Sequence, residues 1–417
     1  MTFLYRIFME LFVLGARLGA KHKPKLWLFT EGRKQGYGDL QEIRTTSSKV
    51  VWMHCASLGE FEQGRPVVEE FKSRHPEYDI YITFFSPSGY EVRKDYQQAA
   101  WVGYLPYDRP GDVQAFLRAL RPDVALMVKY EVWPVLFQAL GQMGIPVIMF
   151  SAIFRPGHRY FKWYGGLFRK ALQSVSHFYV QNEKSVDLLA GIGLTNSTLA
   201  GDTRFDRVAH IAAHSKGVPM ISEFVQDATV LIAGSTWLPD EKLLSTFDAQ
   251  SDQSFKVIIA PHEIGEDHIA QIEHLWGGRT LRYSKASISH LADARILIID
   301  NIGFLSRLYQ YAHFAIIGGG FGAGIHNTLE AAAFGLPVII GPNYTRFQEA
   351  VDLDAIGGAL VVHNQDEFNA ACAKLMIPEE RAERSEAIRR YCRNKQGATA
   401  MIVSGIEAKL LEVAQGA

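Results

Sequence analysis

The chain is poor in cysteine, and its cysteines form no pattern. Cys55, Cys372 and Cys392 are the only three in 417 residues, and no two of them have the spacing of metal ligands. Their scarcity argues against a disulfide framework and a structural zinc, and it fits a reducing, cytoplasmic environment. Excess charge is also missing: the formal net charge is −1, so composition gives no signal for binding a nucleic acid polymer.

Internal repeats and low-complexity tracts are absent as well. Hydrophobic residues make up 48% of the chain and charged residues 21%, which is typical of folded protein and argues against disorder. A chain of 417 residues is long for one hydrophobic core. We therefore expect two domains, or at most three.

A long uninterrupted apolar run is also lacking, because charges break the most apolar segment, residues 1–20. Arg6, Glu10 and Arg17 fall within roughly 40° of one another on a helix, so one face is charged and the rest is apolar. This pattern, with no signal-peptide cleavage site, favours a helix that lies in a membrane interface, or one inserted with its polar stripe protected, over a simple spanning helix. The alternative is a soluble helix packed on its own domain. Three lysines that follow could bind anionic lipid head groups: Lys21, Lys23 and Lys25.

Apolar runs of strand length alternate with stretches of helical pattern, and this order starts again after a polar break at residues 214–227. Such alternation predicts α/β domains with doubly wound parallel sheets. The first five predicted strands are Val50–Cys55, Ile80–Phe85, Val124–Val128, Val147–Phe150 and Phe178–Val180. The second five are Val230–Ala233, Val257–Ala260, Ile296–Ile299, Phe314–Ile317 and Val338–Ile340.

These elements predict two Rossmann-like domains that face a central cleft, with the ligand in the crevice outside the strand ends. We expect a membrane-associated helix at residues 1–25, an N-terminal domain at 26–212 and a C-terminal domain at 213–417. The last stretch, residues 379–411, is charged and helical. It either caps the second domain or crosses back to the first.

A glycine-rich turn in residues 313–342 is the strongest indication of a ligand site. It follows a predicted strand and precedes a helix, an arrangement in which backbone amides and the helix dipole favour a phosphate. Gly318, Gly319 and Gly320 are the predicted phosphate loop, beside His326. No Gly-Lys-Ser/Thr follows, so this is not a Walker loop. The alternative is that the glycines only permit tight packing of strand against helix.

Other polar residues follow the predicted strands. Asn327 and Glu330 lie one helical turn apart, and a carboxylate at that place suits a ribose diol. Segments 234–236, 261–263 and 300–304 surround the same turn. His262, Glu266 and His268 lack a metal-binding spacing, so we expect no metal.

Two carboxylates follow strands of the first half. Glu60 begins a helix after the first strand, and Glu131 follows the strand Val124–Val128. Carboxyl ends of parallel strands share one edge of a sheet, so the two can converge, one accepting a proton and the other orienting or stabilising charge. We expect the helix start to keep Glu60 ionised and to lower its basicity. The alternative is an ordinary acidic residue in a first helical turn.

Basic and aromatic residues are interleaved in residues 154–170. Arg155, Arg159 and Lys162 are the charges that we consider for binding an acceptor lipid at a membrane interface. An ordinary amphipathic helix with snorkelling basic side chains is the alternative.

Five motifs, in this order, resemble those of the 3-deoxy-D-manno-octulosonic acid (Kdo) transferases of Gram-negative bacteria. The resemblance covers nearly the whole chain. The motifs are Trp52–Glu60 (WMHCASLGE), Leu105–Asp108 (LPYD), Glu131–Pro134 (EVWP), Gly234–Thr236 (GST), and Gly324–Glu330 together with Gly341-Pro342.

The resemblance implies a GT-B glycosyltransferase that transfers Kdo from CMP-Kdo to the lipid A precursor lipid IVA at the cytoplasmic face of the inner membrane. It implies an inverting enzyme with no metal and no cofactor. Glu60 is similar to the family's general base, Glu131 to its second acidic site residue, and Arg204 stands where a site lysine is usual. The implied CMP-binding residues are Pro261, His262, Ile302, Gly303, Phe304, Asn327, Thr328, Leu329 and Glu330.

The chain departs from the family pattern at several positions. The basic residue usually found between Pro261 and His262 is missing, and Lys129 and Tyr130 replace an acidic residue and a threonine. Two other functions stay open on the sequence. One is a GT-B enzyme that uses a UDP-sugar, as a transferase or an epimerase, and the other is a non-enzymatic nucleotide-binding membrane module.

Overall fold

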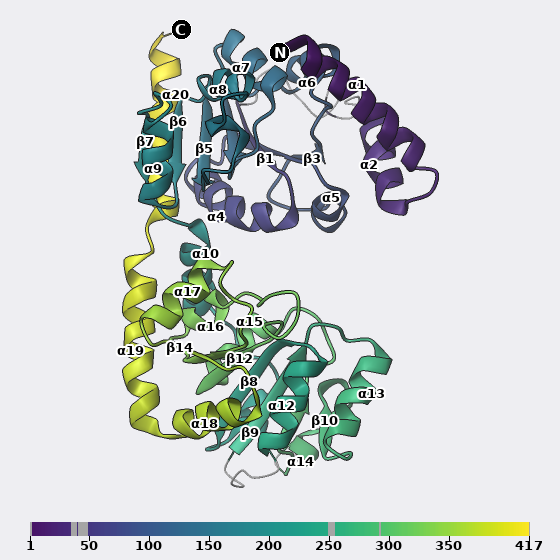
Figure 1. Cartoon of the computed structure of the whole chain (residues 1–417), viewed down its shortest axis with the longest axis vertical. Helices are drawn as coiled ribbons and strands as arrows, with labels where there is room; N and C mark the ends of the chain where they lie inside the picture. The colour runs from purple at the N-terminus through teal and green to yellow at the C-terminus, as the bar shows by residue number, and fades with distance from the viewer. Residues whose placement is uncertain (1, 35–39, 41–48, 249–254, 292, 417) are drawn as a thin grey trace. The chain divides into compact units, whose positions relative to one another are not determined.

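The computed structural model describes residues 2–34, 40, 49–248, 255–291 and 293–416, and it divides the chain into two compact units. The first unit comprises residues 1–206 and 396–417, and the second comprises 207–395. The chain leaves the first unit within α10 (Thr203–Ala213) and returns before α20 (Ala398–Gly416). The last helix, whose position the sequence left open, therefore belongs to the first unit (Figure 1).

In the described part of the first unit, the strands form a parallel seven-stranded sheet in the order β3-β2-β1-β4-β5-β6-β7. Successive side chains point to opposite faces, and each face carries its own apolar cluster. Trp52 packs in one cluster and Val51 in the other. The strands are β1 (Lys49–Cys55), β2 (Tyr78–Phe84), β3 (Trp101–Tyr104), β4 (Val124–Val128), β5 (Val147–Ala152), β6 (His177–Val180) and β7 (Ser197–Leu199).

The second unit repeats this plan. Its described strands form a parallel seven-stranded sheet in the order β10-β11-β9-β8-β12-β13-β14, again with an apolar cluster on each face. The strands are β8 (Thr229–Thr236), β9 (Phe255–Pro261), β10 (Thr280–Arg282), β11 (Ile296–Ile298), β12 (Phe314–Ile317), β13 (Val338–Ile340) and β14 (Ala359–Val361).

All ten predicted strands are present, and the strands that the sequence analysis missed are the four sheet edges. They are β3, β7, β10 and β14. Each has only three or four residues and is partly exposed, because one side of an edge strand has no neighbour. Short, half-buried strands lack the continuous apolar run by which the inner strands were predicted.

Helices cover both sheets, as right-handed crossovers between parallel strands require. Those of the first unit, besides α20, are α1 (Thr2–Gly19), α2 (Pro24–Lys34), α4 (Leu58–Arg74), α5 (Pro87–Arg93), α6 (Pro110–Leu120), α7 (Pro134–Gln142), η1 (Arg159–Phe161), α8 (Gly166–Leu172) and α9 (Glu183–Ala190). Those of the second are α11 (Ile221–Val225), α12 (Leu238–Asp248), α13 (Glu266–Leu275), η2 (Tyr283–Lys285), α14 (Ile288–Leu291), α15 (Leu305–Leu308), η3 (Tyr309–Tyr311), α16 (Leu329–Ala333), α17 (Gln348–Ala355), α18 (Gln365–Met376) and α19 (Pro378–Asn394).

The N-terminal helix α1 is docked on the first unit by only a small part of its surface. Met9, Val13 and Ala16 are buried there, while most of its large apolar side chains face outward. Among the described residues, no helix combines the length and the apolar character needed to cross a bilayer. The exposed apolar residues of α1 are Phe3, Leu4, Ile7, Phe8, Leu11, Phe12, Leu14 and Leu18.

Helix α20 lies along α4 and completes an apolar cluster of the first unit. Ile402, Val403 and Ile406 are fully buried in that cluster, whereas the adjacent Met401 is 43% exposed. The preceding turn is fixed because Asp206 accepts hydrogen bonds from the amides of Gly397 and Thr399.

We therefore expect Ile402→Ala to lower the free energy of unfolding of the first unit by about 2–5 kcal/mol, since it removes buried methylene groups and leaves a cavity. Met401→Ala is the matched control and should change it by less than about 0.5 kcal/mol. Denaturant titration followed by circular dichroism measures both. Equal effects of the two substitutions would contradict the docking of α20 on the first unit.

Candidate functional site

The first sheet brings Glu60 and Glu131 together because its strand order reverses between β1 and β4. β1 pairs with β2 on one side and β4 on the other, so the loops after β1 and β4 leave the shared sheet edge in opposite directions. Ligands of doubly wound sheets bind in the crevice that opens there. Glu60 follows β1 in the first turn of α4, and Glu131 follows β4.

Glu60 is held inside the protein by its own helix start. Ser57 is the N-cap residue of α4, but its side chain caps nothing, and the Glu60 carboxylate accepts a hydrogen bond from the amide of Ala56. Only 6% of Glu60 is exposed. Burial raises its pKa, and the hydrogen bonds from backbone amides together with nearby Lys129 only partly oppose this. The expectation of lowered basicity was therefore wrong, because desolvation outweighs the helix start.

Glu131 is the more strongly perturbed member of the pair. Burial, and next to it the charge of Glu60, raise its pKa to about 7, although Arg159 acts in the opposite direction. The charge of Glu60 opposes ionisation of Glu131, which therefore holds its proton up to near neutral pH. Such a pair suits acid–base work on a neutral hydroxyl.

Two residues near these strand ends have unusual backbone conformations. Lys129, directly after β4, has φ 64°, and Ser151, inside β5, has φ 47°. Left-handed conformations of this kind are uncommon in residues other than glycine and cluster at functional sites. Ser151 is buried, and its hydroxyl pairs with that of Thr203 at 2.9 Å. Lys129 stands where the family pattern has an acid, and here its charge favours ionised Glu60.

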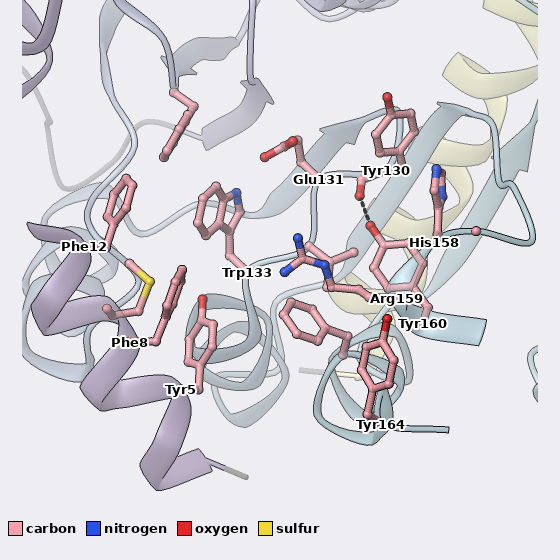
Figure 2. Close-up of a pocket in the computed structure, with 15 residues that line it drawn as sticks. Tyr5, Phe8, Phe12, Tyr130, Glu131, Trp133, His158, Arg159, Tyr160 and Tyr164 are labelled. Carbon is pink, nitrogen blue, oxygen red and sulfur yellow. Dashed lines mark hydrogen bonds between the residues drawn. The ribbon is translucent and has the colours of Figure 1, made fainter. Parts of the chain in front are cut away.

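A pocket of about 630 Å³ opens beside Glu131 in the first unit (Figure 2). Its walls are mainly aromatic, and α1 supplies one of them. Figure 2 shows Phe8 and Tyr5 of α1 on one side, with Trp133 and Arg159 facing them across the space. The lining residues are Tyr5, Phe8, Met9, Phe12, Phe85, Tyr130, Glu131, Val132, Trp133, Gly157, His158, Arg159, Tyr160, Tyr164 and Phe168.

Only one of the three basic residues predicted to bind an acceptor lipid lines this pocket. Arg159 lines it, with its guanidinium carbon 4.8 Å from the centre of the Phe168 ring, whereas Arg155 and Lys162 are not among the lining residues. Arg204 lies elsewhere in the first unit. It pairs with Asp202 at 2.8 Å, and Asp202 also accepts a hydrogen bond from Gln63, one turn beyond Glu60 on α4.

In the second unit, the glycine turn lies at the corresponding reversal of strand order, between β8 and β12. The amide of Gly318 donates to the carbonyl of Gly234 at 2.9 Å, and that of Gly319 donates to Oδ2 of buried Asp240 at 3.0 Å. Both amides therefore have partners within the protein. Their role as a phosphate loop stays a prediction.

Steric constraints explain all three glycines. Gly319 has φ 90°, and a Cβ there would lie 2.5 Å from the carbonyl oxygen of Gly324. A Cβ on Gly318 would lie 2.3 Å from the carbonyl oxygen of Ser235, and one on Gly320 would lie 2.6 Å from the amide nitrogen of Gly341. Backbone atoms cannot yield at such distances. Packing and backbone conformation alone therefore require all three glycines, whether or not they also bind a ligand.

Three rings lie together beside the glycine turn, and the two histidine rings among them are stacked. The His262 and His326 ring centres are 4.4 Å apart, Trp237 lies 4.7 Å from His262, and Trp237 Nε1 donates to His326 Nε2 at 3.0 Å. Burial, with the neighbouring His262, lowers the pKa of His326. This is an aromatic surface of the kind on which a nucleobase stacks. Sequence reasoning missed Trp237, since an isolated tryptophan carries no signal.

The other predicted CMP-binding residues lie in loops of the second unit or at the ends of its strands and helices. Asn327 donates to Glu330 Oε1 at 3.0 Å, and Thr328 Oγ1 is buried with no partner among the described residues. Gly303 has φ 94°. Pro261 ends β9, Ile302 is exposed, Phe304 is the N-cap residue of α15, and Leu329 begins α16.

No group of three or more histidines, cysteines or acidic residues is arranged to hold a metal in the described ranges. Sequence reasoning did not foresee that Tyr5, Trp133 and Asp108 belong to the first site. Trp133 and Asp108 belong to sequence motifs, but only the fold shows that Tyr5 on α1 hydrogen-bonds to Asp108 and lines the same pocket as Trp133.

Comparison with known proteins confirms the resemblance to Kdo transferases. Residues 31–207 match the family described as 3-deoxy-D-manno-octulosonic-acid transferase (kdotransferase). The chain is 28% identical to the 3-deoxy-D-manno-octulosonic acid transferase of Bordetella pertussis, over 86% of both chains. It is 26% identical to that of Aquifex aeolicus (strain VF5), over 78% of this chain and 86% of the relative.

Solved structures confirm the GT-B fold. UDP-GlcNAc 2-epimerase from Neisseria meningitidis matches with a TM-score of 0.59 at 16% identity, covering 87% of this chain and 100% of that one. MurG of Acinetobacter baumannii matches with a TM-score of 0.55 at 13% identity, covering 86% and 99%. At such identities the similarity concerns the fold alone.

The raised pKa of Glu131 predicts a pH-dependent stability. Its pKa of about 7 exceeds the ordinary value of 4.5, so the folded state holds this proton longer and loses stability as pH rises through that interval. At pH 8 we expect Glu131→Gln to have a free energy of unfolding larger than that of wild type by on the order of 2 kcal/mol after solvent screening, and hence a higher unfolding temperature. At pH 5 the two proteins should unfold at nearly the same temperature. Differential scanning calorimetry measures this, and a gain independent of pH would show a packing effect instead.

Proposed function

Because the chain is related in sequence to the Kdo transferases over most of its length, we propose that it is a glycosyltransferase that transfers Kdo from CMP-Kdo to a lipid acceptor in lipopolysaccharide biosynthesis. The finer proposal is that the acceptor is the lipid A precursor lipid IVA. The observation that carries the proposal is the pair formed by buried Glu60 and half-buried Glu131 beside an aromatic pocket.

Glu60 is the proposed general base. Its ionised form accepts the proton of an acceptor sugar hydroxyl while the hydroxyl oxygen forms a bond to the anomeric carbon of Kdo. The bond from that carbon to the CMP phosphate breaks on the opposite face, which inverts the configuration. Burial makes Glu60 a stronger base than a surface glutamate, and the positive charge of Lys129 favours its ionised form.

Glu131, which follows β4, is proposed to assist this step by binding the acceptor. When it is protonated, near or below neutral pH, it can donate a hydrogen bond to the acceptor and adds no repulsion to Glu60. Arg159, in the same pocket, supplies positive charge for an anionic group of the acceptor. An aromatic pocket with one acid and one base suits an amphipathic glycolipid better than a soluble sugar.

The same proposal places the protein on the cytoplasmic face of the inner membrane. The support is the outward apolar surface of α1, with Phe3 73% exposed, and the segment before α8, where Trp163 is 90% exposed. Tryptophan at such positions anchors proteins in the interface between lipid and water. The N-terminal helix then lies on the membrane, as its charged stripe favours.

The catalytic role of Glu60 is tested by Glu60→Gln. The amide can still accept the hydrogen bond from Ala56 but cannot take up a proton, so we expect transfer to fall by about 10²–10⁴-fold with the fold unchanged. The assay incubates purified protein with CMP-Kdo and lipid IVA and counts the sugars added by mass spectrometry. Glu70→Gln, on the same helix but exposed, is the control and should keep full activity. No mass increase with wild type would refute the proposed reaction.

A thermal-shift assay tests the donor separately. We expect CMP to raise the unfolding temperature of the protein, whereas UDP and UDP-sugars should leave it unchanged at the same concentration. Stabilisation by UDP-GlcNAc alone would favour the alternative, a GT-B enzyme that uses a UDP-sugar. Trp237→Ala should abolish the CMP effect if the base stacks on the rings beside the glycine turn.

A further inference from the structure

Helix α1 is attached to the first unit by two polar contacts in addition to its apolar ones. The hydroxyl of Tyr5 donates to Oδ2 of Asp108 at 2.7 Å, and Glu10 pairs with Arg109 at 3.2 Å. The Tyr5 ring also meets Phe168 of α8 edge-on, with ring centres 6.0 Å apart. A helix that served only to hold the protein at a membrane would need none of these contacts.

Asp108 also accepts hydrogen bonds from backbone amides at the start of α7. The N-cap residue of α7 is Trp133, whose side chain cannot cap, and Pro134 has no amide hydrogen. The next two amides donate to Asp108 instead, that of Val135 at 3.0 Å and that of Leu136 at 2.8 Å. Asp108, which is only 2% exposed, therefore caps α7 from a distant part of the chain.

This cap fixes the segment that carries Glu131. Only Val132 and Trp133 separate Glu131 from the first turn of α7. Oδ2 of Asp108 accepts from both Tyr5 and Val135, so one oxygen atom joins α1 to the start of α7. Movement of α1 away from the unit would weaken the cap and loosen the segment from Glu131 to Trp133.

We infer that α1 forms part of the acceptor-binding surface of the pocket. Asp108, held by Tyr5, is a positioning residue, so that the position of the Glu131 side chain depends on the position of α1. The inference rests on the proposed function for the identity of the acceptor. The acyl part of an amphipathic glycolipid lies against Phe8 and Phe12 of α1, and its polar head lies toward Glu131 and Arg159 (Figure 2).

Two phenylalanines of α1 form a matched pair that separates a wall from an anchor. Phe8 lines the pocket and is 58% exposed, whereas Phe3 is 73% exposed and does not line it. In detergent micelles, where no bilayer is needed, we expect Phe8→Ala to raise KM for the lipid acceptor about tenfold and Phe3→Ala to leave it unchanged. KM for the sugar nucleotide should not change in either. Both substitutions should weaken binding to anionic lipid vesicles, as measured by flotation. Equal acceptor KM values for the two variants would contradict the inference that α1 lines the acceptor pocket.

The coupling through Asp108 has its own readout, which needs no activity. Tyr5→Phe keeps the ring on Phe168 but removes the hydroxyl, so we expect faster hydrogen exchange at the amides of Val135 and Leu136, by about tenfold or more. Tyr164→Phe removes another hydroxyl from the same pocket and serves as the control with unchanged exchange. Asp108→Asn should accelerate both amides further.

In the active enzyme, Tyr5→Phe should lower kcat for transfer and leave KM for the sugar nucleotide unchanged. Unchanged exchange at Val135 and Leu136 would overturn the coupling whether or not wild type transfers Kdo. Absence of transfer by wild type with accelerated exchange in the variant would instead refute the proposed reaction and keep the coupling.

Discussion

The pairing of β1 with β4 is the constraint on which the first site depends. The chain forms β2 and β3 before it returns to place β4 on the other side of β1, so the two loops that meet at this point are far apart in sequence. Glu60 and Glu131 are neighbours in space only for this reason. Because both lie within a few residues of their strand ends, the rigid sheet restricts where the two carboxylates can lie.

Burial then determines what the two carboxylates can do. A helix start and backbone amides both favour ionised Glu60, yet desolvation has the larger effect and its pKa rises. The raised basicity of Glu60 in turn depends on the apolar cluster behind α4. Glu131 feels both its own burial and the charge of Glu60, which explains why it is the one whose pKa approaches 7.

The sequence was sufficient to predict the strands that recur along the chain, but insufficient to predict contacts between residues far apart in sequence. Inner strands such as β4 are continuous apolar runs, so all ten were predictable, whereas the edge strand β7 (Ser197–Leu199) has no such run. The positions of Glu60 and Glu131 at one edge of the sheet were predictable because the carboxyl ends of parallel strands share that edge. The contact of Tyr5 with Asp108 was not predictable, since the two residues are 103 positions apart and the sequence around neither one indicates the other as its partner.

The N-terminal helix shows why an amphipathic pattern alone is ambiguous. The sequence offered a membrane helix and a soluble packed helix as alternatives, and α1 has features of both. Met9 and Val13 are buried against the first unit, but Phe3 and Leu4 face outward. The helix thus presents one apolar surface to the first unit and a second one outward. Since Tyr5 lies among these residues and holds Asp108, the position of α1 against the unit bears directly on the segment that carries Glu131.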